Sequence, residues 1–507
     1  MLGRRALVTL FIAMILMVGC QRHPDQTVRM GVATSPLNLD PRFAADATSE
    51  RINRLLYQRL VEFDSKSMPK PGIARWEAIT PLQYRFYLND QANQFSHGRM
   101  LDANDVVATY RQVLDPANGS PKQASLKLIA SIDQIDEQTI EFSLKRADPL
   151  FPAYLTLDIL PAELINQGHD FGREPVGSGP FTLISWPQPG ELHLQRRSDR
   201  QMFEIISVNN PTVRVLKLLR NEIDLLQNDI SPELIGYLRN QTEMKVTQTP
   251  GSNYTYIGFN LEDPVTGDLR VRQAIAHAID REAIIQWVMQ GAARPAESLF
   301  PPEHWASGNL KANDFNPRKS KKILSELGYN SDSPLKLTYK TSSDPFRIRL
   351  ATVIQSQLKA VGIEVDLRSY DWGTFFGDIK QGNFQLYSLS WVGIRTPDIY
   401  RDIFASQSLP PKGANRGRYN NERVDQLLSL AEQQTKLSEQ AALYQLVERE
   451  LHRDLPYIPL WYEHQISAQG RRISGYQLMP DGNYDGLAQV KLNTALERDN
   501  VQSATTN

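Results

Sequence analysis

The sequence predicts a mixed α/β protein that is built from at least two lobes. The chain has 507 residues, more than the size at which a single hydrophobic core stops growing. Between about residues 335 and 391, strand-like and helix-like segments alternate, which indicates a βαβ unit in an α/β lobe. In the first 175 residues, strand-like segments surround one amphipathic helix, which favours an α+β lobe.

The N-terminus has the pattern of a cleaved lipoprotein leader. Two arginines precede an apolar run from Leu7 to Val18, which is too short to span a bilayer. Cys20, the sole cysteine, follows this run and fits a lipobox. The pattern predicts removal of residues 1–19, lipidation of Cys20 and a polar tether over 20–27. The protein is then extracytoplasmic and lipid-anchored to the cell envelope, on the periplasmic side of a membrane or the outer face of the plasma membrane. The alternative is an ordinary secretory signal with a chance cysteine.

Composition and charge argue against a nucleic-acid-binding protein and indicate an ordinary globular one. With 56 basic and 57 acidic residues, the net charge is −1, which argues against a nucleic-acid partner. Hydrophobic residues make up 41% and charged residues 22%, as in ordinary globular proteins. If Cys20 carries lipid, no disulfide can form within the monomer, so the fold must rest on its hydrophobic cores.

The sequence contains no recognisable catalytic or metal-binding motif. Its eight histidines are dispersed and form no H-E-x-x-H pair, so we expect neither a metal nor a cofactor. The segment after the leader has no cysteine nucleophile and no G-x-S-x-G elbow. A hydrolase that uses a pair of carboxylates is the remaining enzyme alternative, but no particular pair stands out. We expect a protein that is not an enzyme.

The first part of the chain predicts strands around one helix. Residues 28–33, 84–88 and 139–144 are rich in branched and aromatic residues, as expected of strands. Between the last two strands, Asp102 and Asp105 have the spacing of a helix cap. Apolar residues then recur near helical spacing, which predicts a helix after Asp102.

The second part predicts several helices and a βαβ unit. Apolar residues at helical spacing predict a helix from near Leu269, followed by a short helix capped by Asp280. Asn316 and Pro317 mark the start of another helix. The further predicted elements are a strand over 335–341, a helix over 346–361, strands over 363–367 and 384–391, and helices over 422–435 and 438–453.

Four blocks, in order, resemble the family 5 extracellular solute-binding proteins, which are the dipeptide, oligopeptide and nickel receptors of ABC importers. The blocks are Ser96–Val107, Glu174–Phe181, Val271–Ile284 and Leu455–Trp461. The resemblance extends from about Val28 to about Leu492. It implies an extracytoplasmic receptor that closes on a peptide-like or other small solute and delivers it to the membrane subunits of an importer.

The resemblance also implies a bilobed periplasmic-binding-protein-like fold of type II, cluster C, with an extra inserted α+β subdomain. It predicts a monomer with hinge crossings near Asn260 and Gly470. The implied parts are lobe I over 28–60, 176–258 and 470–497, the inserted subdomain over 61–175, lobe II over 259–469, and a tail over 498–507.

By position, the resemblance indicates which residues reach the ligand cleft. Thr34 and Ser35 follow the first strand. The segment from Gly251 to Asn260 alternates, which places Asn253 and Thr255 on one face and Tyr254 and Tyr256 on the other. The alternative for this segment is a buried crossover strand. Trp391 is a further candidate at the end of its strand.

The sequence departs from the peptide receptors after Trp391. In those proteins an aspartate three residues later pairs with the α-amino group of the peptide, whereas Ile394 stands here. A buried ammonium group that faces Ile394 would lack a partner. Three interpretations follow. Asp398 substitutes for the missing carboxylate, Arg395 binds an anionic group instead, or Arg395 lies on the surface and the ligand is neutral or apolar.

A second class of function is an envelope lipoprotein that binds a solute for sensing or scavenging, without transport. Ile394 favours it, and so does Gln21, because a residue other than aspartate after the lipidated cysteine directs lipoproteins to the outer membrane of two-membrane bacteria. Such a location would separate the protein from an inner-membrane importer.

Overall fold

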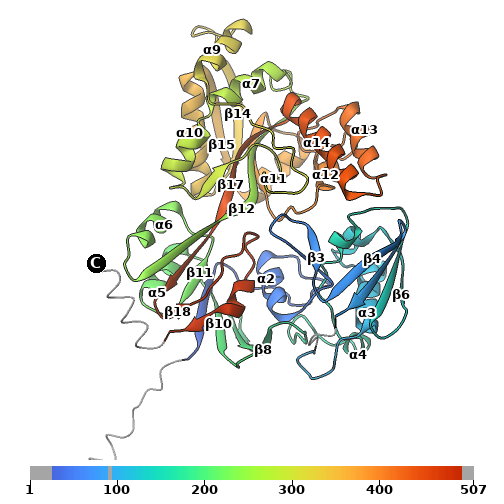
Figure 1. Ribbon diagram of the computed structural model, residues 1–507. Helices are drawn as coiled ribbons and strands as arrows, with labels where there is room; N and C mark the ends of the chain where they lie inside the picture. Colours follow the sequence, from blue (N-terminus) through green and yellow to red (C-terminus); the bar gives the residue numbers. More distant parts are fainter. Residues whose placement is uncertain (1–25, 90–93, 494–507) are drawn as a thin grey trace, which may run out of the picture.

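The computed structural model describes residues 26–89 and 94–493, so the predicted leader and Cys20 lie outside the described residues. Two bodies are joined by long strands, and a small separate sheet lies beside one of them (Figure 1). Within the described ranges, no helix is both long and apolar enough to cross a bilayer. The α/β class and the bilobed architecture predicted from the sequence are confirmed.

One large sheet of eleven strands runs through both lobes. Its strands, in spatial order, are β15 (Ile363–Tyr370), β14 (Leu335–Ser342), β16 (Leu386–Trp391), β12 (Met244–Phe259), β17 (Tyr457–Gly470), β11 (Leu225–Gln227), β1 (Val28–Val32), β10 (Met202–Ser207), β9 (Glu191–Arg196) and β8 (Phe181–Gln188), and β13 (Ala293–Pro295) pairs with β17.

The predicted first strand, β1, lies at the centre of the first lobe. It pairs in parallel with β10 on one side and β11 on the other, and its valines and Met30 are buried. Helix α2 (Ala47–Leu56) is capped by Asp46 and buries Ile52 and Leu55 in the same core. The remaining elements of this lobe are α5 (Pro211–Leu219), α6 (Pro232–Arg239), β18 (Ile473–Ser474), η5 (Asp485–Gln489) and β19 (Lys491–Leu492).

A second sheet with its own core forms the α+β part predicted from the first third of the chain. Asp102 and Asp105 form the predicted capping box at the start of α3 (Ala103–Leu114), and α3 packs on this sheet. The antiparallel sheet has the order β4 (Ala74–Thr80), β5 (Gln83–Leu88), β7 (Thr139–Leu144) and β6 (Ile129–Gln134). The other elements here are β2 (Val61–Phe63), β3 (Pro69–Pro71), η1 (Pro116–Asn118), η2 (Gln123–Leu126), η3 (Phe151–Tyr154) and α4 (Ala162–Asn166).

The block Glu174–Phe181 packs tightly against the end of α2. A Cβ atom added to Gly177 would lie 2.1 Å from the carbonyl oxygen of Leu56, and one added to Gly179 would lie 2.5 Å from that of Leu55. Only glycine allows backbone to approach backbone this closely. The two glycines therefore fix the last turn of α2, which carries Arg54.

The βαβ prediction for the second lobe is confirmed. Strands β14 and β15 are parallel, joined by α10 (Pro345–Ala360), and β16 pairs with β14 in parallel as well. The structure adds α11 (Trp372–Gln381), which sequence analysis missed. Two glycines and several exposed residues obscure the apolar periodicity of this helix.

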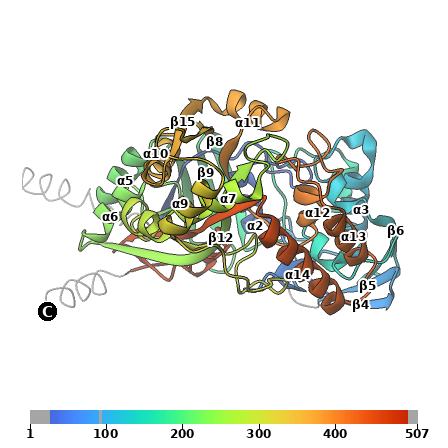
Figure 2. The ribbon, with the colours of Figure 1, turned by 90° about the horizontal axis from the view of Figure 1, so that it is seen from above.

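The helices of the second lobe lie in two groups, which both views separate (Figure 2). One group contains α7 (Leu269–Ala278), α9 (Pro317–Glu326) and α10, and the other contains α12 (Ile399–Phe404), α13 (Glu422–Ala431) and α14 (Leu437–Asp454). The predicted short helix after Asp280 is α8 (Arg281–Ala283), which continues as a π-helical turn, η4 (Ile284–Val288). Helix α13 ends four residues earlier than the sequence predicts.

Two long antiparallel strands, β12 and β17, connect the lobes. Their pairing shifts register between Thr249 and Asn253, about the middle of β12. The hinge positions expected near Asn260 and Gly470 lie at the ends of these strands, and the domain boundaries drawn there remain predictions.

Candidate functional site

Two adjoining cavities lie between the lobes, with volumes of about 480 and 340 Å³. Both are lined by Arg54, Arg59, Phe63 and Arg395. The first three come from α2, β2 and the turn between them, and Arg395 comes from the loop after β16. Because residues of both lobes form the walls, a bound molecule would contact both lobes at once. We call these two spaces the larger and the smaller cleft cavity.

Arg54 forms the base of this site in the last turn of α2. Its side chain is only 10% exposed. Nε donates to both carboxylate oxygens of Asp485, at 2.9 and 3.1 Å, and Nη2 donates to Glu62 at 2.9 Å. Burial opposes the charge, but the bond to Asp485 and the charge of Glu62 outweigh it and raise the pKa of Arg54. The guanidinium is therefore a fixed positive charge.

Arg59 is held by a buried ion pair. Its Nε and Nη2 atoms donate to Oδ1 of Asp158 at 2.9 and 2.6 Å. The side chain of Asp158 is 2% exposed, and that of Arg59 is 8% exposed. This pair joins the segment after α2 to the α+β subdomain and fixes the cleft wall.

Arg395 reaches across the cleft from the second lobe. Its Nη2 donates to Oδ2 of Asp481 at 3.1 Å, and its guanidinium lies 5.0 Å from the ring centroid of Phe63. Burial lowers its pKa, and the charges of Arg54 and Arg59 lower it further, against the opposing effect of Asp481. Arg395 therefore lies in the cleft wall rather than on the open surface, with 27% of its side chain exposed.

His304 anchors the backbone of Arg395. Its Nδ1 accepts from the backbone N–H of Ala306, so its Nε2–H donates to the carbonyl oxygen of Arg395 at 2.9 Å. The ring stacks on Phe300, with the ring centroids 4.0 Å apart. These contacts require the neutral imidazole and fix the loop that carries Arg395.

Acid is expected to weaken the fold through His304. Burial lowers its pKa from 6.5 to about 4, so the unfolded state binds more protons between these values. The stabilisation is complete above the unfolded pKa and is lost progressively as the pH falls from the unfolded pKa to the folded pKa. At pH 5 the expected loss is about 2 kcal/mol relative to pH 7.5. Urea unfolding at both pH values should show that His304→Gln lacks this part of the pH dependence. If the free energy of unfolding of His304→Gln depends on pH as strongly as that of the wild type, His304 is not the cause of this acid sensitivity.

Asp398 and Ile394 do not line the cleft cavities, although Gly393 and Arg395 on either side of Ile394 line the smaller one. Asp398 lines neither cavity, and its Oδ1 is buried and accepts no hydrogen bond from the described residues. Burial raises its pKa, and the charge of Asp148 in the α+β subdomain raises it further. Ile394 packs against an aromatic core cluster of the second lobe. Asp398 is therefore close to the α+β subdomain and is not a lining residue of the smaller cavity beside Arg395.

Thr34 and Ser35 lie at the end of β1, next to the start of α2. The hydroxyl of Thr34 is 2.8 Å from that of Thr48, and Ser35 is partly buried. Neither residue lines the cleft cavities. Their contact with a ligand remains a prediction.

The candidates on β12 lie beside Trp391 in the large sheet. Tyr254 is directly opposite Trp391 in the ladder, and Asn253 is partly exposed. Thr255 is buried and contacts the hydroxyl of Ser390 at 2.6 Å. Tyr256 is buried and stacks on Tyr457. These residues line neither cleft cavity, and their ligand role is still a prediction.

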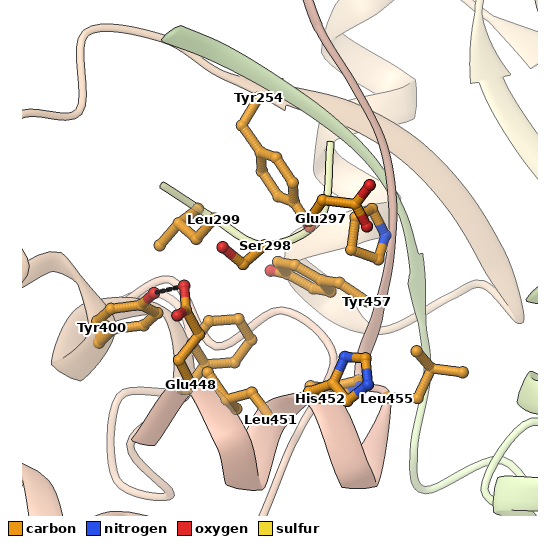
Figure 3. A pocket seen from close by; sticks show the side chains of 13 residues that line it. Tyr254, Glu297, Ser298, Leu299, Tyr400, Glu448, Leu451, His452, Leu455 and Tyr457 are labelled. Atoms are coloured by element: carbon orange, nitrogen blue, oxygen red, sulfur yellow. Dashed lines mark hydrogen bonds between the residues drawn. The ribbon is translucent and has the colours of Figure 1, made fainter. Parts of the chain in front are cut away.

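Tyr254 lines a different, small cavity inside the second lobe (Figure 3). Glu448 lies at this cavity and accepts a hydrogen bond from Tyr400 at 3.1 Å. The volume is about 40 Å³, which is room for a few water molecules but not for a solute. The ligand site is therefore better placed at the cleft cavities.

Sequence reasoning found Arg395 but missed Arg54, Arg59, Phe63 and Asp481. One signal could have indicated the two arginines. They stand in the segment from Arg54 to Val61, which is otherwise mostly apolar, and an arginine among buried residues needs an acidic partner. The partner itself cannot be read from such a pattern.

Among the described residues, one group of three possible metal ligands lies close together. It consists of Glu191, His193 and Glu204 on the neighbouring strands β9 and β10. Arg29 already pairs with Glu204 at 2.8 Å, so a cation lies beside the group. We assign it no metal.

Residues 68–408 match the model of the family described as bacterial extracellular solute-binding proteins, family 5 (middle), which covers more than half of the chain. The chain belongs to this family. The resemblance stated from the four sequence blocks is thereby confirmed. Family 5 proteins are binding proteins rather than enzymes.

Similar proteins match this family 5 protein over nearly its whole length. Di/tripeptide-binding protein 2 of Pseudomonas aeruginosa is 27% identical, over 95% of this chain and 98% of its own. Heme-binding protein A of Haemophilus influenzae is 28% identical, over 91% of each chain. The structure of HbpA2 from Haemophilus parasuis matches with a TM-score of 0.78 and 25% identity, covering 92% of this chain and all of its own. The fold is also similar to that of CtaP from Listeria monocytogenes, with a TM-score of 0.83 and 22% identity, covering 92% of this chain and 99% of that one.

Proposed function

We propose that this family 5 protein is an extracytoplasmic receptor that closes on a peptide-like or other small solute and delivers it to an ABC importer. The observation that carries the proposal is the pair of cleft cavities, whose walls contain residues of both lobes. The ligands for which its relatives are named, di/tripeptides and heme, support a solute of small or moderate size. We expect the receptor to act as a monomer and without covalent chemistry.

The mechanism follows from the fact that both lobes contribute residues to the walls of the cleft cavities. A ligand between the lobes contacts both only when they are close together, so it binds the closed state more tightly and shifts the population toward it. Contacts across the cleft support such a state. Arg395 pairs with Asp481, and Arg146 Nη1 donates to the carbonyl oxygen of Glu432 at 3.1 Å. An importer can then distinguish a loaded receptor from an empty one by shape.

Closure can be tested with the mature soluble protein, starting after Cys20, and a panel of peptides and small solutes. A true ligand should raise the melting temperature and reduce the radius of gyration in X-ray scattering. The receptor proposal fails if no solute raises the melting temperature and the scattering curve is the same under all conditions.

The proposed membrane attachment rests on the sequence around Cys20. Cys20→Ala is expected to release the protein from the membrane fraction, because no acyl chain can then be attached. Cell fractionation and immunoblotting measure this, with Gln21→Ala as a control that keeps the anchor. A Cys20→Ala protein that stays membrane-bound would overturn the lipoprotein proposal.

The alternative function, solute binding for sensing or scavenging without transport, would place the protein away from an importer. In a two-membrane bacterium, separation of inner and outer membranes distinguishes the two functions. Recovery with the outer membrane favours the alternative, and recovery with the inner membrane favours delivery to an importer.

A further inference from the structure

Two acidic side chains lie where the α+β subdomain meets the second lobe. Helices α12, α13 and α14 lie beside this subdomain in both views of the ribbon (Figures 1 and 2). Arg146 of the subdomain bonds there to the carbonyl oxygen of Glu432, which follows α13. The neighbouring side chains, which we call the interlobe acid cluster, are Asp148 and Tyr154 of the subdomain and Asp398, Gln440 and Tyr444 of the second lobe.

Asp148 supplies the carboxylate on the subdomain side and is 4% exposed. Its Oδ1 accepts from the backbone N–H of Leu150 at 2.9 Å, and its Oδ2 accepts from the hydroxyl of Tyr154 at 3.2 Å. The side chain of Gln440, on α14, lies beside it. Burial raises the pKa of Asp148, against the bond from Leu150 and the charge of Arg146. The second lobe therefore packs over a carboxyl group whose charged form is disfavoured.

Asp398 supplies the carboxylate on the other side, immediately before α12. Its side chain does not cap that helix, and its Oδ1 is buried without a donor among the described residues. The buried Oε1 of Gln440 lacks a donor in the same part of the chain. An unpartnered buried acceptor is costly, and a carboxylate can only accept. A proton on either carboxyl group would add a donor to this acceptor-rich contact.

The other charged and titratable groups around the cluster do not neutralise it. Arg401, on α12, already pairs with Glu432. The charge of Glu432 opposes that of Asp398. The phenols of Tyr154 and Tyr444 are buried, and burial together with the charges of both aspartates raises their pKa. The tyrosines therefore stay neutral, and the pair of carboxyl groups is the part of the cluster that takes up protons.

Separation of the lobes would return Asp148 and Asp398 to water, where a carboxylate keeps its ordinary pKa. Closure buries the two like charges near each other, which favours the protonated form of at least one. The closed state therefore binds protons more tightly than the open state does. By linkage, a fall in pH must shift the population toward the closed state.

We infer that the interlobe acid cluster makes closure of the lobes sensitive to pH: ionised Asp148 and Asp398 oppose the closed state, and uptake of a proton by the pair favours it. The inference rests on the closing motion of the proposed receptor function. At neutral pH the charged pair works against closure of the empty receptor, so the contacts of a bound solute must outweigh it.

The sign of the effect distinguishes the cluster from other acid-sensitive contacts. Acid can only weaken the contact between Arg395 and Asp481, which joins the lobes, so that contact predicts opening at low pH. The folded-state pKa of His304 is about 4, so protonation of its anchoring ring also predicts loosening, chiefly at lower pH. Closure on mild acidification is expected only from the cluster.

The pH dependence of closure can be measured on the mature soluble protein without a solute. The segment after Cys20 contains no cysteine, so Ser131→Cys on β6 and Gln426→Cys on α13 place one dye on each side of the contact. Single-molecule energy transfer then gives the ratio of closed to open molecules. From pH 8 to pH 5.5 we expect this ratio to rise about three- to tenfold, since one pKa unit in one group corresponds to about tenfold.

Substitutions in the labelled protein test whether the two carboxyl groups are the cause. Asp148→Asn and Asp398→Asn each remove a charge and keep the shape, so each should raise the closed fraction at pH 8 and reduce its pH dependence. The double variant should be closed to the same extent at both pH values. Glu439→Gln removes an exposed carboxylate of α14 that pairs with Lys436, and it should behave like the wild type. Melting curves check that each variant is folded.

The outcomes separate this inference from the receptor proposal. A wild-type ratio that does not change with pH overturns the inference, whether the molecules are mixed, all open or all closed. A ratio that falls on acidification overturns it, and so does a double variant with the full wild-type pH response. If a solute closes the labelled protein while pH has no effect, the inference fails and the receptor function stands.

Discussion

Arg59→Met is expected to lower the free energy of unfolding by about 3–5 kcal/mol. The reason is the buried partner that the substitution leaves behind. Both guanidinium bonds of Arg59 end on Oδ1 of Asp158, whose side chain is almost wholly buried. Removing the arginine leaves a buried carboxylate that must either stay charged without a partner or take up a proton. Urea unfolding of the ligand-free protein measures the loss.

A double substitution distinguishes this cause from lost packing. Arg59→Met combined with Asp158→Leu removes both charges, and such replacements are often close to neutral in stability. We expect the double variant to recover most of the loss. Arg85→Met, which breaks a more exposed ion pair with Glu141 on the same subdomain, should cost much less stability than Arg59→Met. A double variant no more stable than Arg59→Met would contradict the ion-pair explanation.

Arg272→Met should also destabilise the fold by about 3–5 kcal/mol. Arg272 is 6% exposed and stands on α7. It donates to four backbone carbonyl oxygens, those of Thr266, Gly267, Asp454 and Leu455, at 2.7–3.0 Å. The guanidinium thus ties the start of α7 to the segment that leads into β17. Without it, these carbonyl groups lose their donor in a buried place.

The matched control lies two residues earlier on the same helix. Arg270 is largely exposed and, among the described residues, forms its ion pair with Asp268, so Arg270→Met should change stability far less than Arg272→Met. Thermal and urea unfolding of both variants give the comparison. Equal losses at the two positions would show that the carbonyl contacts of Arg272 do not carry the effect.

Much of the fold could be read from local patterns. The capping box at Asp102, the helix that begins at Pro317 and the βαβ unit of the second lobe all lie where the sequence predicts them. Each depends on residues within one or two turns of each other, so the pattern and its cause are both local. Helix α11 was missed because glycines and exposed residues interrupt its apolar face.

The candidate site could be predicted only in part. Arg395 was found because its position departs from the pattern of peptide receptors. Its neighbours Arg54, Phe63 and Asp481 are distant in the sequence and meet it only because the lobes face each other. The same tertiary arrangement places Asp398 near Asp148 of the α+β subdomain, and Asp398 lines neither cleft cavity.

The sequence by itself determined the family, the α/β class and most helices and strands, since periodicity, caps and turn residues act over short distances. Only the tertiary structure decided which charges share the cleft. The type of a residue indicates how polar its own position is, but it does not indicate which residue is its partner. The partner depends on how segments far apart in the chain are brought together, and here the long strands β12 and β17 set that arrangement.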